Sequence, residues 1–167
     1  KNGKPPKGEE KYPVTNVSLA DAKAYAEWIS KRDGKTCRLP TEEEWEFAAR
    51  NGSRQTSFPW GDEWREDAAN LATGRSEEVG TSADETLVGG IKDMLGSVIE
   101  WTDSKYSLYE SHPGKLVENK ELYVVRGSSW GESEDRLSNA KWLITRRQAV
   151  PEQTKSPFLG FRLVCEP

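Results

Sequence analysis

The stretch VVRGSSWGESEDR, residues 124–136, carries a spacing that can do chemistry. Gly127, Ser129 and Gly131 match the G-x-S-x-G pattern of a nucleophile elbow, in which a sharp turn after a strand exposes a serine hydroxyl. Such a serine needs a base within hydrogen-bond reach and a third group that orients the base. The only histidine, His112, precedes Ser129, whereas in α/β-hydrolases the histidine follows the serine. We therefore interpret the match as a tight turn and not as a hydrolase site.

The sequence motifs of phosphate-binding loops and of zinc sites are also missing. GGIKDMLGS, residues 89–97, lacks the preceding strand and the lysine placement of a phosphate-binding loop. There is no C-x-x-C pair or Cys/His cluster, which excludes a zinc site. Cys37 and Cys165 either form a disulfide, worth roughly 4–5 kcal/mol for so long a loop, or remain two buried thiols. The spacing alone leaves both alternatives open.

Length and composition predict one hydrophilic globular domain. The chain has 167 residues, of which 34% are hydrophobic and 31% charged, and its seven tryptophans suggest a core built on large aromatic side chains. A formal charge of −4 argues against a nucleic-acid partner. No apolar run reaches 18 residues, so we expect no membrane span and no membrane contact from this chain. Because Lys1 is not a start methionine, we expect a processed or excised portion of a longer protein.

Two helices are predicted near the N-terminus, separated by a short strand, TCRLP, at 36–40. The first covers residues 16–32, with Ser18 as N-cap and Asp21 at the capping-box position. Its buried face is formed by Leu19, Ala22, Ala26 and Ile29.

The second predicted helix covers residues 41–52. Thr41 is its N-cap, Glu44 completes a capping box and Gly52 is the expected stop. Trp45, Ala48 and Ala49 supply the buried face. The acidic run 42–44 is interpreted as charge that stabilises the helix start and not as a metal site.

From residue 53 onward, Gly, Pro, Asn and Ser recur, and the predicted strands are short. They lie at 124–128 (VVRGS), 143–147 (LITRR) and 160–164 (GFRLV). Helices followed by short strands and long loops predict an α+β fold and not alternating βαβ units. We expect residues 1–12 to form an extended lead-in and residues 13–167 a single domain.

Seven stretches in the same order resemble the formylglycine-generating enzyme, or sulfatase-modifying factor, family. They are Tyr12–Trp28, Cys37–Gly52, Phe58–Trp64, Ala69–Asn70, Asp93–Thr102, Val124–Trp130 and Gly160–Val164. The resemblance implies the loop-rich variant of the C-type lectin fold. An N-terminal part that usually precedes PVTNVS in this family is missing. RGSSW resembles the family's Arg-Gly-Gly-Ser-Trp strand end, with Ser128 where a second glycine is usual.

The departures from the family concern its chemistry. In its oxidising members, a cysteine pair shortly after this strand end binds copper and oxidises a substrate cysteine. The stretch from Gly131 to Arg147 has no cysteine, so soft thiolate ligation of copper is impossible there. The resemblance therefore implies that formylglycine-generating activity is absent and that Cys37 and Cys165 form a structural disulfide. A related sulfoxide-synthase type uses iron held by histidines of an additional domain, which the single His112 cannot supply.

Calcium is also disfavoured, and we expect no cofactor. Members that bind calcium use an asparagine where this chain has Ser97 and a second asparagine, kept here as Asn70, followed by an aspartate that is missing. The remaining metal candidates are Asn70, Ser97 and Glu100. If Glu100 is buried instead, it needs a partner, for which Arg38 and Arg162 are the candidates.

The connection from Gly131 to Leu159 is long enough to carry a function. Mixed charges around an aromatic side chain are typical of a polar recognition surface. The candidate ligand-binding residues are Trp130, Glu132, Glu134, Asp135, Arg136, Asn139, Lys141, Trp142, Arg146 and Arg147. The alternative is that these charges form a solvated face and that Trp142 belongs to the core.

The sequence thus predicts a non-catalytic binding module that presents residues 130–155 to a protein, peptide or glycan. It would be part of a larger surface-displayed or sensor protein, at the cell surface or in the periplasm rather than the cytoplasm. A retroelement-diversified variable protein is one form of this hypothesis. The alternative is an enzyme or enzyme subunit of the sulfatase-modifying or sulfoxide-synthase type, with metal chemistry supplied by another domain.

Overall fold

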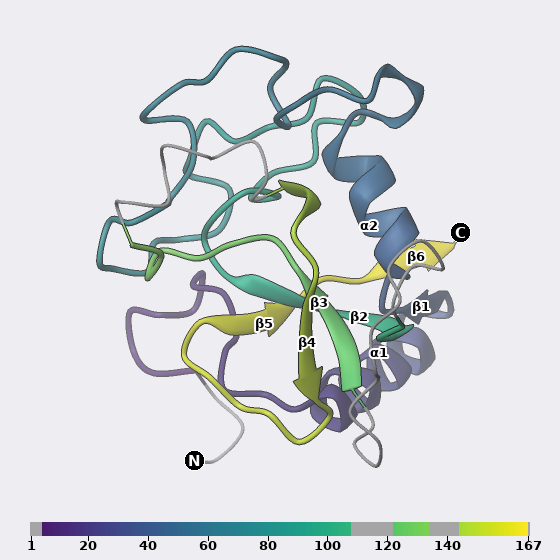
Figure 1. The fold of residues 1–167 in the computed structure, drawn as a ribbon. Coiled ribbons are helices and arrows are strands. Elements are labelled where there is room, and N and C mark those ends of the chain that lie inside the picture. Colours follow the sequence, from purple (N-terminus) through teal and green to yellow (C-terminus); the bar gives the residue numbers. More distant parts are fainter. Residues whose placement is uncertain (1–4, 108–121, 134–143, 167) are drawn as a thin grey trace.

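The computed structural model describes residues 5–107, 122–133 and 144–166 (Figure 1). Helices and short strands alternate with long loops, as predicted for an α+β fold. Residues 5–12 form turns without helix or strand, and the division of the chain at residue 12 stays a prediction. The elements are α1 (Leu19–Asp33), β1 (Thr36–Arg38), α2 (Glu42–Ala49), the 3-10 turn η1 (Gly52–Arg54), β2 (Ile99–Lys105), β3 (Leu122–Arg126), β4 (Gln148–Pro151), β5 (Leu159–Phe161) and β6 (Val164–Glu166).

The capping boxes predicted for both helices are confirmed. Ser18 Oγ accepts a hydrogen bond from the Asp21 amide, and the Asp21 carboxylate accepts one from the Ser18 amide. Thr41 and Glu44 exchange the same two bonds at the start of α2. These local bonds satisfy amide groups that have no partner inside the helix, which is why the sequence alone could place both helix starts.

The end of α2 was predicted too late. The helix stops at Ala49, and the chain turns at Asn51, whose φ of 60° is left-handed. The buried Asn51 amide group donates to Thr56 Oγ1 at 2.7 Å and to the Pro59 carbonyl at 2.8 Å. Asparagine tolerates this backbone region and takes the role predicted for Gly52, which instead opens η1.

The strands described form two sheets. One has the order β4-β3-β2-β5, with β5 parallel to β2 and the other neighbours antiparallel. The other pairs β1 with β6. In Figure 1 the long loops between α2 and β2 gather at the end of the molecule beyond the sheet, whereas α1 lies at the opposite end. The strand predicted at 124–128 begins and ends two residues earlier.

The other two predicted strands require correction. Of the stretch LITRR, Ile144 and Thr145 are helical and Arg146 and Arg147 belong to no strand, so β4 begins only at Gln148, while Leu143 lies outside the described residues. The carbonyls of Ile144 and Thr145 accept hydrogen bonds from the side chain of Arg126. GFRLV is split between two sheets, since Phe161 pairs with β2 and Val164 with β1. The chain changes sheet at Arg162 and Leu163, which a local pattern cannot reveal.

Cys37 and Cys165 face each other across β1 and β6 and form a disulfide, with Cα atoms 4.1 Å apart. The disulfide implied by the family resemblance is therefore confirmed, and it ties a strand near the end of the chain to the strand that follows α1. Two groups of buried apolar side chains, one around Trp45 and one around Trp101, form the core. In the described part of the chain, no helix has the length and apolarity needed to cross a membrane.

Candidate functional site

The predicted binding stretch leaves the sheet at a tight turn after β3. Gly127 has a φ of +82°, and a Cβ there would lie 3.2 Å from the Trp45 ring, so glycine is required. Ser128 has no positive φ and is fully buried, which explains why a side chain is tolerated where the family has a second glycine. Its hydroxyl donates to Glu132 Oε2 at 2.6 Å. Ser129 is buried too, and its carbonyl accepts from the Glu132 amide.

Trp130 is half-buried and packs its ring against Phe158, with ring centroids 4.6 Å apart. Its backbone links three loops, because its amide donates to the Ser97 carbonyl and its own carbonyl accepts from the Gly74 amide. The indole nitrogen is buried and has no hydrogen-bond partner in the described part of the chain. Trp130 therefore links neighbouring loops in this structure, and its indole N–H remains a donor without a partner in the described part of the chain.

The charged side chains at the two described ends of the stretch are paired and withdrawn from solvent. Glu132 and Arg146 form an ion pair of 2.8 Å, with side chains only 9% and 8% exposed. Arg147 forms two 2.6 Å bonds with Glu42 of α2 and stacks on the Tyr106 ring. These three charges belong neither to a solvated face nor to an open cluster. They fasten the stretch to the body of the domain.

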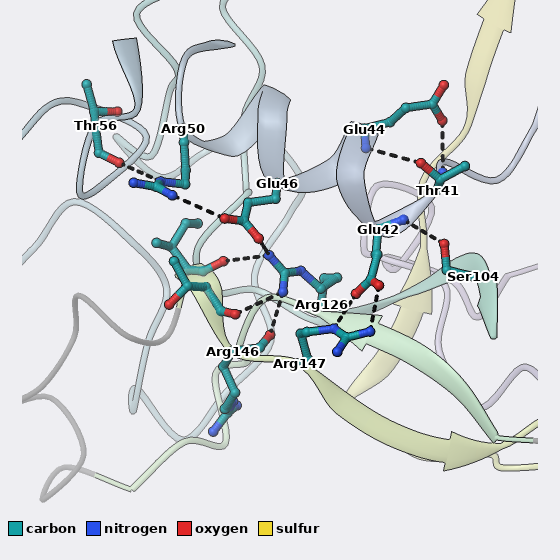
Figure 2. Close-up of polar contacts among 12 residues, drawn as sticks. Thr41, Glu42, Glu44, Glu46, Arg50, Thr56, Ser104, Arg126, Arg146 and Arg147 are labelled. Atoms are coloured by element: carbon teal, nitrogen blue, oxygen red, sulfur yellow. Dashed lines mark hydrogen bonds and ion pairs between the residues drawn. The ribbon is translucent and has the colours of Figure 1, made fainter. Parts of the chain in front are cut away.

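Arg126, at the end of β3, is the centre of this arrangement and was missed in the sequence (Figure 2). Its fully buried guanidinium donates to the carbonyls of Thr145 at 2.9 Å, Arg146 at 3.3 Å and Ile144 at 3.3 Å. It also forms an ion pair with Glu46 of α2. One side chain thus holds the returning end of the stretch against both the sheet and a helix. The available signal was an arginine directly after two buried valines.

Two acids of α2 do more than stabilise the helix start. Glu42 binds Arg147, and its amide donates a hydrogen bond to Ser104 Oγ at 3.0 Å. Glu44 binds Arg38 at 2.6 and 2.7 Å. The hydrogen bonds from Arg38, and then from the Thr41 amide, lower the pKa of Glu44 to about 2.

Of the metal candidates, Asn70 and Ser97 are in contact, and the oxygens of Asn70 and Glu100 already accept hydrogen bonds. The Asn70 carbonyl accepts from the Ser97 amide at 2.9 Å, and the Asn70 side chain bonds with Thr73 and the Arg75 carbonyl. Both Glu100 oxygens are taken, one of them by the Trp45 indole, which donates at 2.7 Å.

The other partner of Glu100 is Arg162, at 2.6 and 2.8 Å, so of its two candidate partners Arg162 is the observed one. A carboxylate facing a guanidinium and an indole is poorly suited to ligate calcium, which needs several free oxygen donors. The described residues contain no group of three or more His, Cys, Asp or Glu that could hold a metal ion.

A second buried acid, Asp84, lies near this cluster. Its Oδ2 accepts a 2.5 Å bond from the Leu95 amide, whereas Oδ1 has no partner in the described part of the chain. Burial raises the pKa of Asp84 to about 7, with the nearby Asp93 carboxylate acting in the same direction. Sequence reasoning missed Asp84, because a lone aspartate in a polar loop gives no sign of burial.

Of the other predicted ligand-binding residues, Glu134, Asp135, Arg136, Asn139, Lys141 and Trp142 lie outside the described residues. The structure brings Trp130, Glu132, Arg146 and Arg147 to the base of that segment. His112 also lies outside the described residues.

The family is established by sequence. The sulfatase-modifying factor enzyme 1-like domain matches residues 1–167, and the chain belongs to this family. The inactive Cα-formylglycine-generating enzyme 2 of Bos taurus is 34% identical over 164 residues, which cover 90% of this chain and 49% of that protein. The formylglycine-generating enzyme of Streptomyces coelicolor is 37% identical over 177 residues, covering 93% of this chain and 53% of that enzyme. The chain thus spans about half the length of these relatives.

Two solved structures share the fold. PvdO from Pseudomonas aeruginosa superimposes with a TM-score of 0.74 at 29% identity, covering 94% of this chain and 63% of that one. Treponema denticola variable protein 1 also gives a TM-score of 0.74, at 23% identity, covering 99% of this chain and 76% of that one. The expected α+β fold of the formylglycine-generating-enzyme type is therefore confirmed.

Proposed function

We propose that this chain is a non-catalytic ligand-binding module of its family. The observation that carries the proposal is the disulfide between Cys37 and Cys165, because the sequence has two cysteines and both are consumed by it. No thiol is left to bind copper or to exchange with a substrate cysteine. The 34% identity with a relative named as an inactive enzyme supports the same view.

The ligand surface that we propose is the stretch 130–155, with a protein, peptide or glycan as ligand. Glu132, Arg146, Arg147 and Trp130 are engaged inside the domain, and we assign them to the frame that positions this surface. The ligand contacts are then assigned to the residues between the two fixed ends, namely Glu134, Asp135, Arg136, Asn139, Lys141 and Trp142. A frame that is fixed before binding lowers the entropy lost when a ligand docks.

The setting that we propose is a larger protein displayed at the cell surface or in the periplasm, as a sensor or as a variable receptor. A structural disulfide persists in oxidising compartments, which supports this location over the cytoplasm. The fold shared with a protein named as variable is compatible with a diversified ligand surface.

A second candidate function is an enzyme subunit whose metal chemistry comes from another domain. It is favoured by the 37% identity with the Streptomyces enzyme, of which this chain covers only 53%. In that case the surface at 130–155 would hold a substrate segment for a neighbouring active site.

An oxidation assay tests whether residues 1–167 are catalytic by themselves. Residues 1–167 are incubated with Cu(I), oxygen and a cysteine-containing peptide, with the Streptomyces enzyme as positive control, and the peptide is analysed by mass spectrometry. We expect no aldehyde from this chain. Formation of an aldehyde would overturn the non-catalytic assignment.

Binding is tested on peptide and glycan arrays probed with residues 1–167. The triple variant Glu134→Ala, Asp135→Ala, Arg136→Ala should lose about tenfold in affinity for the best array ligand. The matched control, Lys7→Ala, Glu9→Ala, Glu10→Ala, removes the same charges from the exposed N-terminal segment and should bind as the parent does. Equal affinities for the two triple variants would exclude the 130–155 surface.

A further inference from the structure

The four-stranded sheet has an open edge next to the proposed ligand stretch. In the order β4-β3-β2-β5, β4 pairs with β3 on one side and with no strand on the other in the described part of the chain (Figure 1). A strand edge presents backbone amides and carbonyls that can bind a further strand. Because β4 lies within the stretch 130–155, this edge adjoins the ligand surface proposed above.

The hydrogen bonds between β2 and β3 show which residues of β3 face β4. The Val124 carbonyl accepts a hydrogen bond from Thr102 Oγ1 of β2 at 2.7 Å. The Leu122 carbonyl accepts one at 2.8 Å from the amide that follows β2. Successive residues of a strand direct their backbone groups to opposite sides. Val125 therefore faces β4, where Gln148 lies opposite it.

The same alternation fixes the orientation of β4. Ala149 lies opposite Val124, whose backbone groups face β2, so these two residues form a non-hydrogen-bonded pair. The amide and carbonyl of Ala149 thus point away from β3, and among the described residues they meet no hydrogen-bond partner.

Pro151 shares this outward orientation, but its backbone leaves little free. Proline has no amide to donate, which suits the outer side of an edge strand, and the Pro151 carbonyl accepts a hydrogen bond from the Thr154 amide at 2.9 Å. Of these two outward-facing residues, Ala149 keeps both a donor and an acceptor, and it is exposed.

We propose that the ligand of this module is an extended peptide that adds to β4 through two hydrogen bonds to Ala149. This inference rests on the proposed ligand-binding function and specifies the class of ligand. Two residues that form a hydrogen-bonded antiparallel pair exchange both of their backbone bonds. An extended peptide offers the matching acceptor and donor on one residue, which is the basis of recognition by strand addition.

The open edge is fixed before any ligand binds. The Arg126 guanidinium holds the carbonyls of residues 144–146, directly before β4. Arg147 is tied to Glu42 of α2 by two bonds of 2.6 Å, and pairing with β3 orders the strand itself. A peptide therefore meets a preformed template, which lowers the entropy lost on binding.

A peptide fits this edge better than a second copy of the chain. The strand has four residues, and the carbonyl of Pro151 is already used. Two copies paired at Ala149 would exchange two hydrogen bonds, whereas a stable dimer needs roughly 1,200 Å² or more of buried surface. A peptide on this edge can also reach the residues of the stretch 130–155 that we assign to ligand contact.

The variant that tests the contact is Ala149→Pro. It removes the outward amide and no hydrogen bond to β3, and edge strands accept proline at such positions. Ala149→Val is the matched control, because it enlarges the side chain and keeps the amide. The probe is an array of acetylated octapeptides with β-branched residues at alternate positions, which favour an extended backbone. For the best octapeptide, Ala149→Pro should lose at least about tenfold in affinity, and Ala149→Val should bind like the parent.

Hydrogen exchange tests the edge in the parent protein as well. In the free protein, the Ala149 amide should exchange quickly, whereas the Val150 amide, which faces β3, should be protected. Saturation with the best octapeptide should slow exchange of the Ala149 amide at least about tenfold. Protection of the Val150 amide in Ala149→Pro verifies that this variant keeps β4 paired with β3.

The outcomes separate this inference from the proposed function. Equal affinities of Ala149→Pro and the parent for the best octapeptide, or an Ala149 amide that gains no protection, would overturn strand addition. A glycan that binds where no octapeptide does would also overturn it and would leave the ligand-binding function standing. Absence of binding on both the peptide and the glycan arrays would overturn the function itself. A dimer in size-exclusion chromatography with light scattering that Ala149→Pro dissociates would show that a second copy occupies the edge.

Discussion

The frame below the 130–155 stretch and the outer face of α1 reverse the usual relation between residue type and burial. In the frame, Arg126, Arg146 and Glu132 are charged and almost fully buried. On the outer face of α1, Tyr25 and Trp28 are large and aromatic, and about half of each remains exposed. The comparison shows that this domain buries charged side chains where they form ion pairs and hydrogen bonds.

The buried charges are stable because each finds several partners. Arg126 offers a planar set of donors, and its two terminal nitrogens donate to three carbonyls and pair with the Glu46 carboxylate, whereas its Nε has no partner in the described part of the chain. The aromatic residues on the outer face of α1 have fewer partners, although the Arg32 guanidinium lies 4.9 Å from the Trp28 ring centre. We therefore expect the buried ion pairs to stabilise the fold strongly and the half-exposed rings of α1 to contribute little to its stability.

The largest effect on stability is expected from loss of the disulfide between β1 and β6. The double variant Cys37→Ala, Cys165→Ala opens a loop closed by a sequence separation of 128 residues, which should lower the free energy of unfolding by about 4–5 kcal/mol. Urea unfolding measures the loss, and the parent protein under reducing conditions is the control. An unchanged midpoint would mean that β1 and β6 stay paired without the covalent link.

Removing the centre of the frame should cost nearly as much. Arg126→Met leaves three carbonyls without this donor and leaves Glu46 with Arg50 alone, and we expect a loss of about 3–5 kcal/mol in urea unfolding. Arg32→Met is the control, because that arginine pairs with Asp33 at the surface, and it should leave the unfolding midpoint unchanged. Similar midpoints for the two variants would contradict the contrast between buried and exposed charge.

Asp84 extends the comparison, because it is a buried carboxyl group whose side chain accepts a hydrogen bond from one group, the Leu95 amide. Its pKa of about 7 in the folded state lies above the usual value of 3.8, so the fold favours the protonated form. Its contribution is fully present below pH 4 and is lost progressively as pH rises toward 7, by roughly 2–4 kcal/mol. Asp84→Asn should remove this part of the pH dependence, measured by urea unfolding at pH 5 and pH 8. Parallel pH profiles for parent and variant would exclude a titrating Asp84.

The smallest effect on stability is expected from removing an exposed ring of α1. Trp28→Ala should change the free energy of unfolding by no more than about 0.5 kcal/mol, because half of the ring is exposed. Trp101→Ala, which removes a fully buried tryptophan, should lose about 3–5 kcal/mol. Thermal melts of the two variants measure the difference. A large loss for Trp28→Ala would place this ring in the core of the domain.

The sequence by itself determined what depends on neighbours along the chain. Both capping boxes, the buried face of α1 and the glycine turn after β3 follow from local hydrogen bonds and backbone preferences, and the order of seven motifs was enough to indicate the family. For the candidate site, the sequence predicted a stretch and its candidate residues, but not the ion pairs that Glu132, Arg146 and Arg147 form.

Only the tertiary structure decided which charges meet. Arg126 reaches Glu46 across 80 positions, and Arg147 reaches Glu42 across 105, so no local pattern could pair them. The same holds for the splitting of residues 159–166 between two sheets. Long-range contacts set the free-energy cost of burying each side chain. That cost is low for Arg126, which finds partners far away in the sequence.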